Sequence, residues 1–152
     1  MPTFRTALTN LANLSVTGVA NNYDLDAVPD TIHRAQLPAL LVLPVDIQDE
    51  RLFERRGEGF QAIAFSSGPR TVTYALTHLL LVAPVSAGKG IRSHLPALID
   101  LIDAYFSALG DDVTLNSALL EPARVRVEPG VFKHGEVEYH ACAFRHVWVM
   151  AV

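Results

Sequence analysis

The sequence predicts an α+β domain in which two principal helices pack on one face of a mostly antiparallel sheet of about five or six strands. Three observations lead to this prediction. A chain of 152 residues, half of them hydrophobic, has the length and apolar content of a single compact domain. Several apolar runs of strand length follow one another through short turns, which favours antiparallel pairing. Only two segments carry their apolar side chains mainly at helical spacing.

The N-terminal third is expected to begin with a helix and to reach its first long strand through loops. Residues 2–14 place an apolar side chain every three to four positions, which predicts the helix. Residues 15–27 contain turn-forming residues and predict a short strand and a loop, and residues 29–34 predict one helical turn. Residues 38–44 form an apolar run bounded by prolines, which indicates a strand that is buried on both faces or lies at an edge.

The middle of the chain predicts a hairpin. Residues 60–67 and 71–84 are joined by the sequence Ser-Gly-Pro-Arg, which is typical of a turn. The second strand alternates, so that one of its faces is strongly apolar. That face is expected to be buried and consists of Val72, Tyr74, Leu76, Leu80 and Val82.

Residues 91–109 predict the main helix, which Gly110 terminates. Its apolar stripe is expected to face the core and consists of Ile91, Leu95, Leu98, Ile99, Ile102 and Phe106. A strand over residues 123–128 is expected to be broken by Pro129 and Gly130. The chain then ends in a long strand over residues 135–152.

Both faces of this last strand are apolar toward its C-terminal end, so both require cover. One face can be covered by the helices. For the other we consider two alternatives: a second core layer made by the N-terminal segment, or an interface with another subunit. The second alternative makes four residues candidate contacts with a partner: His140, Phe144, His146 and Trp148.

Residues 46–59 form the only stretch that is dense in charge. They are either a solvated loop or a protruding docking loop, because arginine and aromatic side chains are enriched at interfaces. The second interpretation adds four candidate contact residues, which are Arg51, Phe53, Arg55 and Arg56.

Composition and motifs argue against several other functions. The net charge of -4 argues against a general nucleic-acid binder. The single cysteine, Cys142, excludes an intramolecular disulfide framework and is expected to be a buried, inert thiol. The histidines are scattered, and residues 83–90 depart from the phosphate-loop pattern at two positions. We find no secretory signal, no membrane-spanning run and no nucleophile elbow. We therefore expect no catalytic, cofactor-binding or metal-binding residues.

The segments LPALIDLIDAYFSALGDD, TLNSALLEPARVRVEP and EVEYHACAFRHVWVMAV, which lie between residues 95 and 152, carry a resemblance to a known family. In length, order of elements and C-terminal pattern the chain resembles the tail terminators of long-tailed phages, of the broad class of the lambda minor tail protein U, and related tail-completion or neck proteins. The resemblance implies a virion structural protein, assembled in the host cytoplasm. Such a protein forms a homo-oligomeric ring, commonly a hexamer, that caps the tail tube and ends its polymerisation.

The resemblance also implies the partners of this ring. They are further copies of the chain, the tail tube protein and the head–tail connector proteins, with DNA only as passing cargo and with no membrane. Two alternatives from other classes remain open: a dimeric adaptor or ligand-binding module, and a small enzyme without a recognised motif. The adaptor interpretation predicts a two-fold dimer in place of a ring, so the oligomeric state distinguishes the two.

Overall fold

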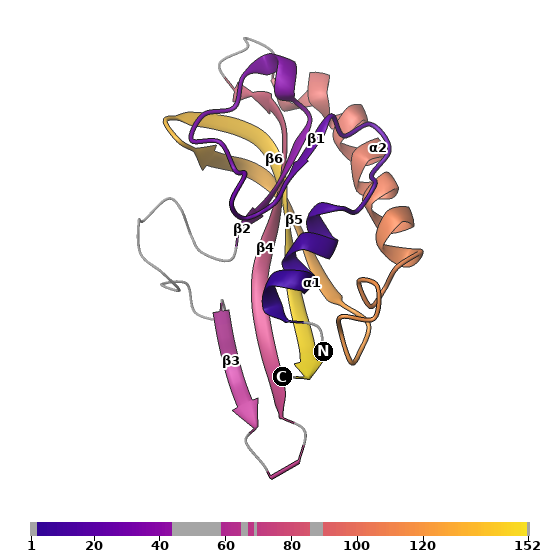
Figure 1. The fold of residues 1–152 in the computed structure, drawn as a ribbon. Coiled ribbons are helices and arrows are strands. Elements are labelled where there is room, and N and C mark those ends of the chain that lie inside the picture. The colour runs from indigo at the N-terminus through magenta and orange to yellow at the C-terminus, as the bar shows by residue number, and fades with distance from the viewer. Residues whose placement is uncertain (1–2, 44–58, 65–66, 69, 86–89, 152) are drawn as a thin grey trace.

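The computed structural model describes residues 3–43, 59–64, 67–68, 70–85 and 90–151, and it confirms the predicted α+β fold. Two α-helices, one 3-10 helix and six strands follow one another along the described chain (Figure 1). In order they are α1 (Phe4–Ala12), β1 (Asn21–Tyr23), η1 (Arg34–Gln36), β2 (Ala39–Leu43), β3 (Gly59–Ala64), β4 (Thr71–Pro84), α2 (Ile91–Gly110), β5 (Arg124–His134) and β6 (Val137–Ala151).

The strands form one sheet in the order β1-β2-β4-β6-β5, and β3 also pairs with β4. All pairs are antiparallel except β1 with β2, which is parallel. The two longest strands, β4 and β6, pair along almost their whole length and form the centre of the sheet (Figure 1). The edge of β4 opposite β6 is shared, because Thr77–Leu81 pair with β2 and Thr71–Ala75 pair with β3.

One face of the sheet forms the main core with the two helices. Helix α1 packs on β2, and α2 packs on β4 and β6. The strongly apolar face predicted for β4 is buried here, together with the even-numbered residues of β6. From α2 the core receives chiefly Leu98, Leu101, Tyr105 and Leu109. The Tyr105 ring lies flat on the Phe144 ring, with centroids 3.7 Å apart and planes 6° from parallel.

The other face of the sheet is covered at one end by the N-terminal segment. Ile32, with Val28 and Leu37 beside it, packs on Tyr139 and on the small side chains that follow it along β6. Two hydrogen bonds anchor this layer: the Tyr139 hydroxyl donates to the Ile32 carbonyl at 3.1 Å, and His134 Nε2 lies 2.7 Å from the carbonyl oxygen of Pro29. The first of the two alternatives for the second face of the last strand is therefore correct over this part of β6.

The β5–β6 turn is fitted closely to the same layer. It consists of Gly135 and Glu136, and Gly135 has φ +62°, a conformation that glycine adopts without cost. A Cβ atom at this position would lie 2.6 Å from the backbone oxygen of Asp30. Any larger residue would therefore push the N-terminal layer away from the sheet.

Three expectations from the sequence are wrong. The helical turn expected over residues 29–34 is not formed, and the 3-10 helix η1 lies beyond it at Arg34–Gln36. Pro129 and Gly130 do not break their strand, because β5 continues through them to His134. The strand lies at the edge of the sheet, where a missing backbone N–H can face outward without losing a ladder hydrogen bond. The stripe predicted to bury α2 is also wrong in part, since Ile91, Leu95, Ile99 and Phe106 are exposed.

No helix in the described ranges is long and apolar enough to cross a membrane.

Candidate functional site

The structure overturns the four contact residues that the sequence suggested on the last strand. His140, Phe144, His146 and Trp148 are all buried within the domain itself, on the face that the helices cover. Their side chains therefore contact the chain's own core and are not available to a partner. The other four candidates, Arg51, Phe53, Arg55 and Arg56, lie outside the described residues.

Buried polar side chains form a continuous chain of hydrogen bonds through the main core. The indole N–H of Trp148 donates to Nδ1 of His146 at 3.1 Å, and Nε2 of His146 lies 2.6 Å from the Tyr105 hydroxyl. That hydroxyl lies 2.8 Å from Nδ1 of His78, whose Nε2 lies 2.9 Å from Oδ1 of Asn22. Asn22 then donates to two carbonyls at the C-terminal end of α1, those of Leu11 and Leu14.

The two ends of this chain determine the position of every proton in it. Indole can only donate, so Nδ1 of His146 accepts and its Nε2–H donates to Tyr105. At the other end both amide hydrogens of Asn22 are used, so its oxygen accepts from Nε2–H of His78. The Tyr105 hydroxyl therefore donates to Nδ1 of His78. Each histidine is neutral, with a single tautomer, and both of its ring nitrogens have a hydrogen-bond partner.

Burial opposes any change in these protonation states. It lowers the pKa of His146 to about 3, and it lowers the pKa of His78 well below the ordinary value, with a smaller contribution from His146. Burial also raises the pKa of Tyr105 well above its ordinary value. A buried, neutral and fully bonded network of this kind ties both helices to the sheet. It offers neither an accessible base nor an open coordination position.

Cys142 has the environment of a structural thiol. It is completely buried in the helix-side core, and burial raises the pKa of the thiol to about 12. Because the thiolate is the reactive form, this thiol is not a nucleophile near neutral pH. The sequence-based expectation of a buried thiol is confirmed.

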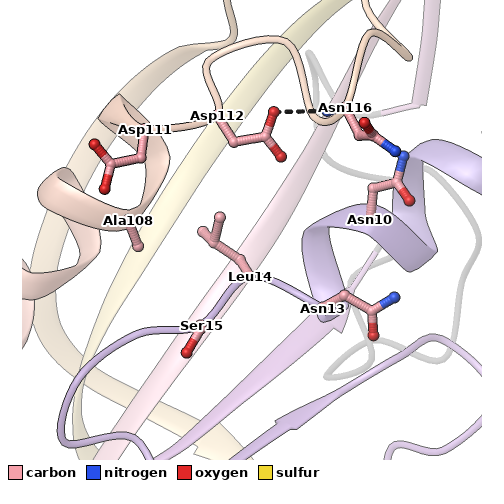
Figure 2. Close-up of a pocket in the computed structure, with 8 residues that line it drawn as sticks. All are labelled: Asn10, Asn13, Leu14, Ser15, Ala108, Asp111, Asp112 and Asn116. Atoms are coloured by element: carbon pink, nitrogen blue, oxygen red, sulfur yellow. Dashed lines mark hydrogen bonds between the residues drawn. The ribbon is translucent and has the colours of Figure 1, made fainter.

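An open, polar cleft of about 450 Å³ lies between the C-terminal ends of α1 and α2 (Figure 2). Asn10 and Asn13 line it from α1, and Asp111 and Asp112 line it from the end of α2. The carboxylate of Asp112 is already engaged, because its Oδ1 accepts from the backbone N–H of Asn116 at 2.6 Å (Figure 2). The cleft thus has two acidic groups at its rim, and one of them serves the adjoining loop.

The most prominent surface feature is the apolar shoulder of α2, which we define as Leu95, Ile99, Ile102 and Phe106. Leu95, Ile99 and Phe106 are 44%, 50% and 49% exposed. At 3.6 residues per turn the four side chains fall within an arc of about 60°, directly beside the arc that the core buries. Helix α2 therefore carries an apolar sector too wide for its own sheet to cover. Large exposed apolar side chains grouped in this way are typical of an association surface.

The shoulder faces the β5 edge of the sheet. Ala108 of α2 lines the cleft with α1, and Phe106 points roughly 160° away from it around the helix. Since α1 lies over β2 and α2 over β4 and β6, the direction away from α1 is toward β5 (Figure 1). Val131 of β5 adds a further apolar side chain that is 54% exposed.

Strand β5 is also an open edge. It has 11 residues, and its outer side pairs with no strand in the part of the chain that the structure describes. An exposed edge strand presents unpaired backbone N–H and C=O groups, which neighbouring chains readily use. The shoulder and this edge together form the candidate functional site of the protein.

A second surface lies on the opposite face of the sheet and carries basic charge. Arg124 and Arg126 of β5 are exposed there, beside the half-buried Val147 and Arg145 of β6. Glu128 accepts from both Arg126 and Arg145, so the described charged side chains here, Arg124, Arg126, Arg145 and Glu128, carry a net positive charge. Arg124 forms no ion pair with any described residue.

Sequence reasoning identified the residues of the shoulder but assigned them to the wrong environment. The available signal was the full width of the apolar sector, because Leu101, Tyr105 and Leu109 extend the predicted stripe to an arc of about 160°, which is wider than the roughly 100° of one packed face. Comparison with models of known protein families finds no match for this chain, and comparison with curated proteins also finds none.

Proposed function

We propose that this protein is a structural assembly subunit that associates with copies of itself into a ring, of the type that caps a phage tail tube and joins it to the head connector. The observation that carries the proposal is the exposed apolar shoulder of α2 beside the open edge of β5. Association with a partner that removes this apolar surface from water is favourable.

A closed ring needs two different, complementary patches on each subunit, whereas a two-fold dimer uses one patch twice. The described surface offers such a pair. The first patch is the α2 shoulder, with the exposed Asp103 at its border and the exposed Asp100 about 60° further round the helix, and neither aspartate forms an ion pair among the described residues. The second is the basic sheet surface with Arg124, Arg126 and Val147.

The two patches lie on opposite sides of the sheet, because α2 covers the face that carries the even-numbered residues of β6 and the arginines lie on the other. Apolar side chains then meet apolar side chains, and aspartates meet arginines, only when subunits associate head to tail. Repetition of one head-to-tail contact produces a ring when the rotation closes. The interaction requires contact alone and involves no bond chemistry.

Charge reversal tests this arrangement. We expect Asp100→Arg/Asp103→Arg to abolish self-association by blocking the first patch, and Arg124→Glu/Arg126→Glu to abolish it by blocking the second. Each variant alone repels itself at this contact, whereas in an equimolar mixture every contact between unlike variants pairs opposite charges, so the mixture should assemble beyond the heterodimer with the two variants alternating. A chain carrying all four changes should recover the ring, because the charges are complementary again.

Matched charge changes away from both patches serve as the control. Asp30→Arg and Glu136→Arg replace exposed residues at the covered end of the sheet and should leave assembly unchanged. If Arg124→Glu/Arg126→Glu assembles normally while Asp100→Arg/Asp103→Arg does not, the contact is a two-fold pairing of α2 with itself. That result would overturn the ring and favour the dimeric adaptor.

A further inference from the structure

Two imidazoles, those of His94 in α2 and His140 in β6, meet beside the first turn of α2. Their ring centroids are 5.2 Å apart and their planes are inclined by 31°. His140 is only 5% exposed. Both ring nitrogens of His140, and Nε2 of His94, are buried and have no hydrogen-bond partner among the described residues.

This pair departs from the pattern of the other buried histidines. His78 and His146 use both ring nitrogens in the polar chain of the core, and His134 has a carbonyl partner. A buried polar group without a partner costs about 1–3 kcal/mol. Three such nitrogens within one pair of rings therefore indicate that something outside the described chain satisfies them.

We propose that His94 and His140 together bind a divalent late transition metal ion, Zn²⁺ being the expected occupant. Neutral imidazole is the commonest protein ligand for such ions. Two imidazole nitrogens that each lie about 2.0–2.1 Å from a tetrahedral zinc ion place their ring centroids about 5 Å apart, which matches the observed separation. This inference rests on the histidine pair and is independent of the proposed assembly function.

The protein supplies two ligands to this site, one nitrogen from each ring, and water completes the coordination and bonds the second nitrogen of His140. No group of three or more histidine, cysteine or acidic side chains in the described ranges is arranged to hold a metal. Cys142 lies two residues from His140 on the same face of β6, but it forms no such group with the two histidines. The site is therefore one of nitrogen and oxygen ligands, with positions that remain exchangeable.

Cobalt(II) is the direct probe. We would treat the full chain, without a histidine tag, with chelator and titrate it with Co²⁺ while recording visible and near-ultraviolet absorption. One equivalent of Co²⁺ should bind and give d–d bands without a thiolate charge-transfer band, and Zn²⁺ should displace it. Zn²⁺ should also raise the melting temperature, because it binds only the folded chain.

Substitutions assign the binding to the pair. His94→Ala, at a half-buried position, should weaken Co²⁺ and Zn²⁺ binding by at least about tenfold. His140→Asn should do the same, with circular dichroism confirming that each variant is folded. The exposed His33→Ala and the buried Cys142→Ala are the controls, and both should bind as the wild type does.

Three results would overturn the proposal. One is the absence of Co²⁺ and Zn²⁺ binding at millimolar metal, which would mean that water alone satisfies the nitrogens. Another is wild-type affinity in the folded His94→Ala variant. The third is a thiolate band that Cys142→Ala removes. None of these results changes the mass of the assembled protein, so they are distinguishable from failure of the ring.

Discussion

The Tyr105 hydroxyl lies 2.6 Å from Nε2 of His146 and 2.8 Å from Nδ1 of His78, so one phenol oxygen joins two buried imidazoles from different strands. Tyr105 belongs to α2, while His78 and His146 belong to β4 and β6. This contact holds the helix in one position and thereby determines which of its apolar side chains enter the core. The shoulder is exposed because Tyr105, and not Phe106, occupies the interior.

Tyr105→Phe removes this hydroxyl and keeps the stacking on Phe144. We expect a loss of about 2 kcal/mol in the free energy of unfolding, because both imidazoles are left with an unsatisfied buried nitrogen. Urea denaturation measures the change. Tyr139→Phe, which leaves only the Ile32 carbonyl without its bond, is the matched control and should cost about 1 kcal/mol. Equal losses in the two variants would argue against the network.

The neutral histidines predict sensitivity to acid. The pKa of His146 is lowered to about 3 and that of His78 is also lowered, so below pH 6.5 the unfolded chain takes up protons that the folded chain excludes. Stability is therefore complete above pH 6.5 and falls as the pH decreases toward 3. At pH 5 His146 should cost about 2 kcal/mol relative to pH 7.5, and His78 should add to the loss in the same direction.

Urea denaturation at the two pH values tests this expectation. His146→Gln removes one of the titrating groups and should reduce the loss of stability between pH 7.5 and pH 5 by about 2 kcal/mol, which is the contribution of His146. An unchanged pH dependence in a folded His146→Gln variant would show that other groups dominate the response to acid.

The loop after α2 contains three consecutive left-handed residues, Leu115, Asn116 and Ser117, with φ of 50°, 55° and 63°. Such a conformation costs an ordinary residue about 1–2 kcal/mol. Ser117 is exposed, so Ser117→Gly should stabilise the protein by about 1 kcal/mol in thermal or urea unfolding. Leu115→Gly should destabilise it, because the side chain of Leu115 is completely buried. Destabilisation by Ser117→Gly would contradict this view of the loop.

The shoulder of α2 predicts a variant that separates folding from assembly. Ile99 is half-exposed, so Ile99→Asp should lower the free energy of unfolding by only about 1 kcal/mol. Self-association should be lost, because a charge would then lie in the middle of the contact. Ala97→Asp, exposed on the other flank of the same helix, is the control and should assemble normally. Size-exclusion chromatography with light scattering measures both.

The charged segment at residues 46–59 adds a further prediction, which comes from the sequence. Arg55→Glu/Arg56→Glu should leave the subunit folded and impair assembly if this segment is a docking loop. Circular dichroism and light scattering measure the two effects. Normal assembly of this variant would remove the docking-loop interpretation and leave the solvated loop.

The fold was predictable because local patterns and global packing agree along most of the chain. The alternation in β4 and β6, and the turn signals between strands, are properties of short segments that the structure preserves. The open edge at β5 was not predictable from the sequence. A proline such as Pro129 interrupts a central strand but is tolerated in an edge strand, and only the order of strands in the sheet shows which case applies.

The candidate site was harder to predict than the fold for a related reason. Apolar periodicity shows which residues avoid water, but it does not distinguish cover by the same chain from cover by a partner. The sequence suggested Trp148 and Phe144 as contacts and placed Ile99 in the core, whereas the structure has the opposite arrangement. The difference depends on how α2 is rotated, which Tyr105 and its two histidine partners determine.

The most direct test of the central claim is the mass of the full-length protein by light scattering, combined with negative-stain imaging in the presence and absence of phage tail tubes. The account predicts a closed ring larger than a dimer, either in solution or at the ends of the tubes. A stable two-fold dimer, or a monomer, that leaves the tube ends bare would contradict it.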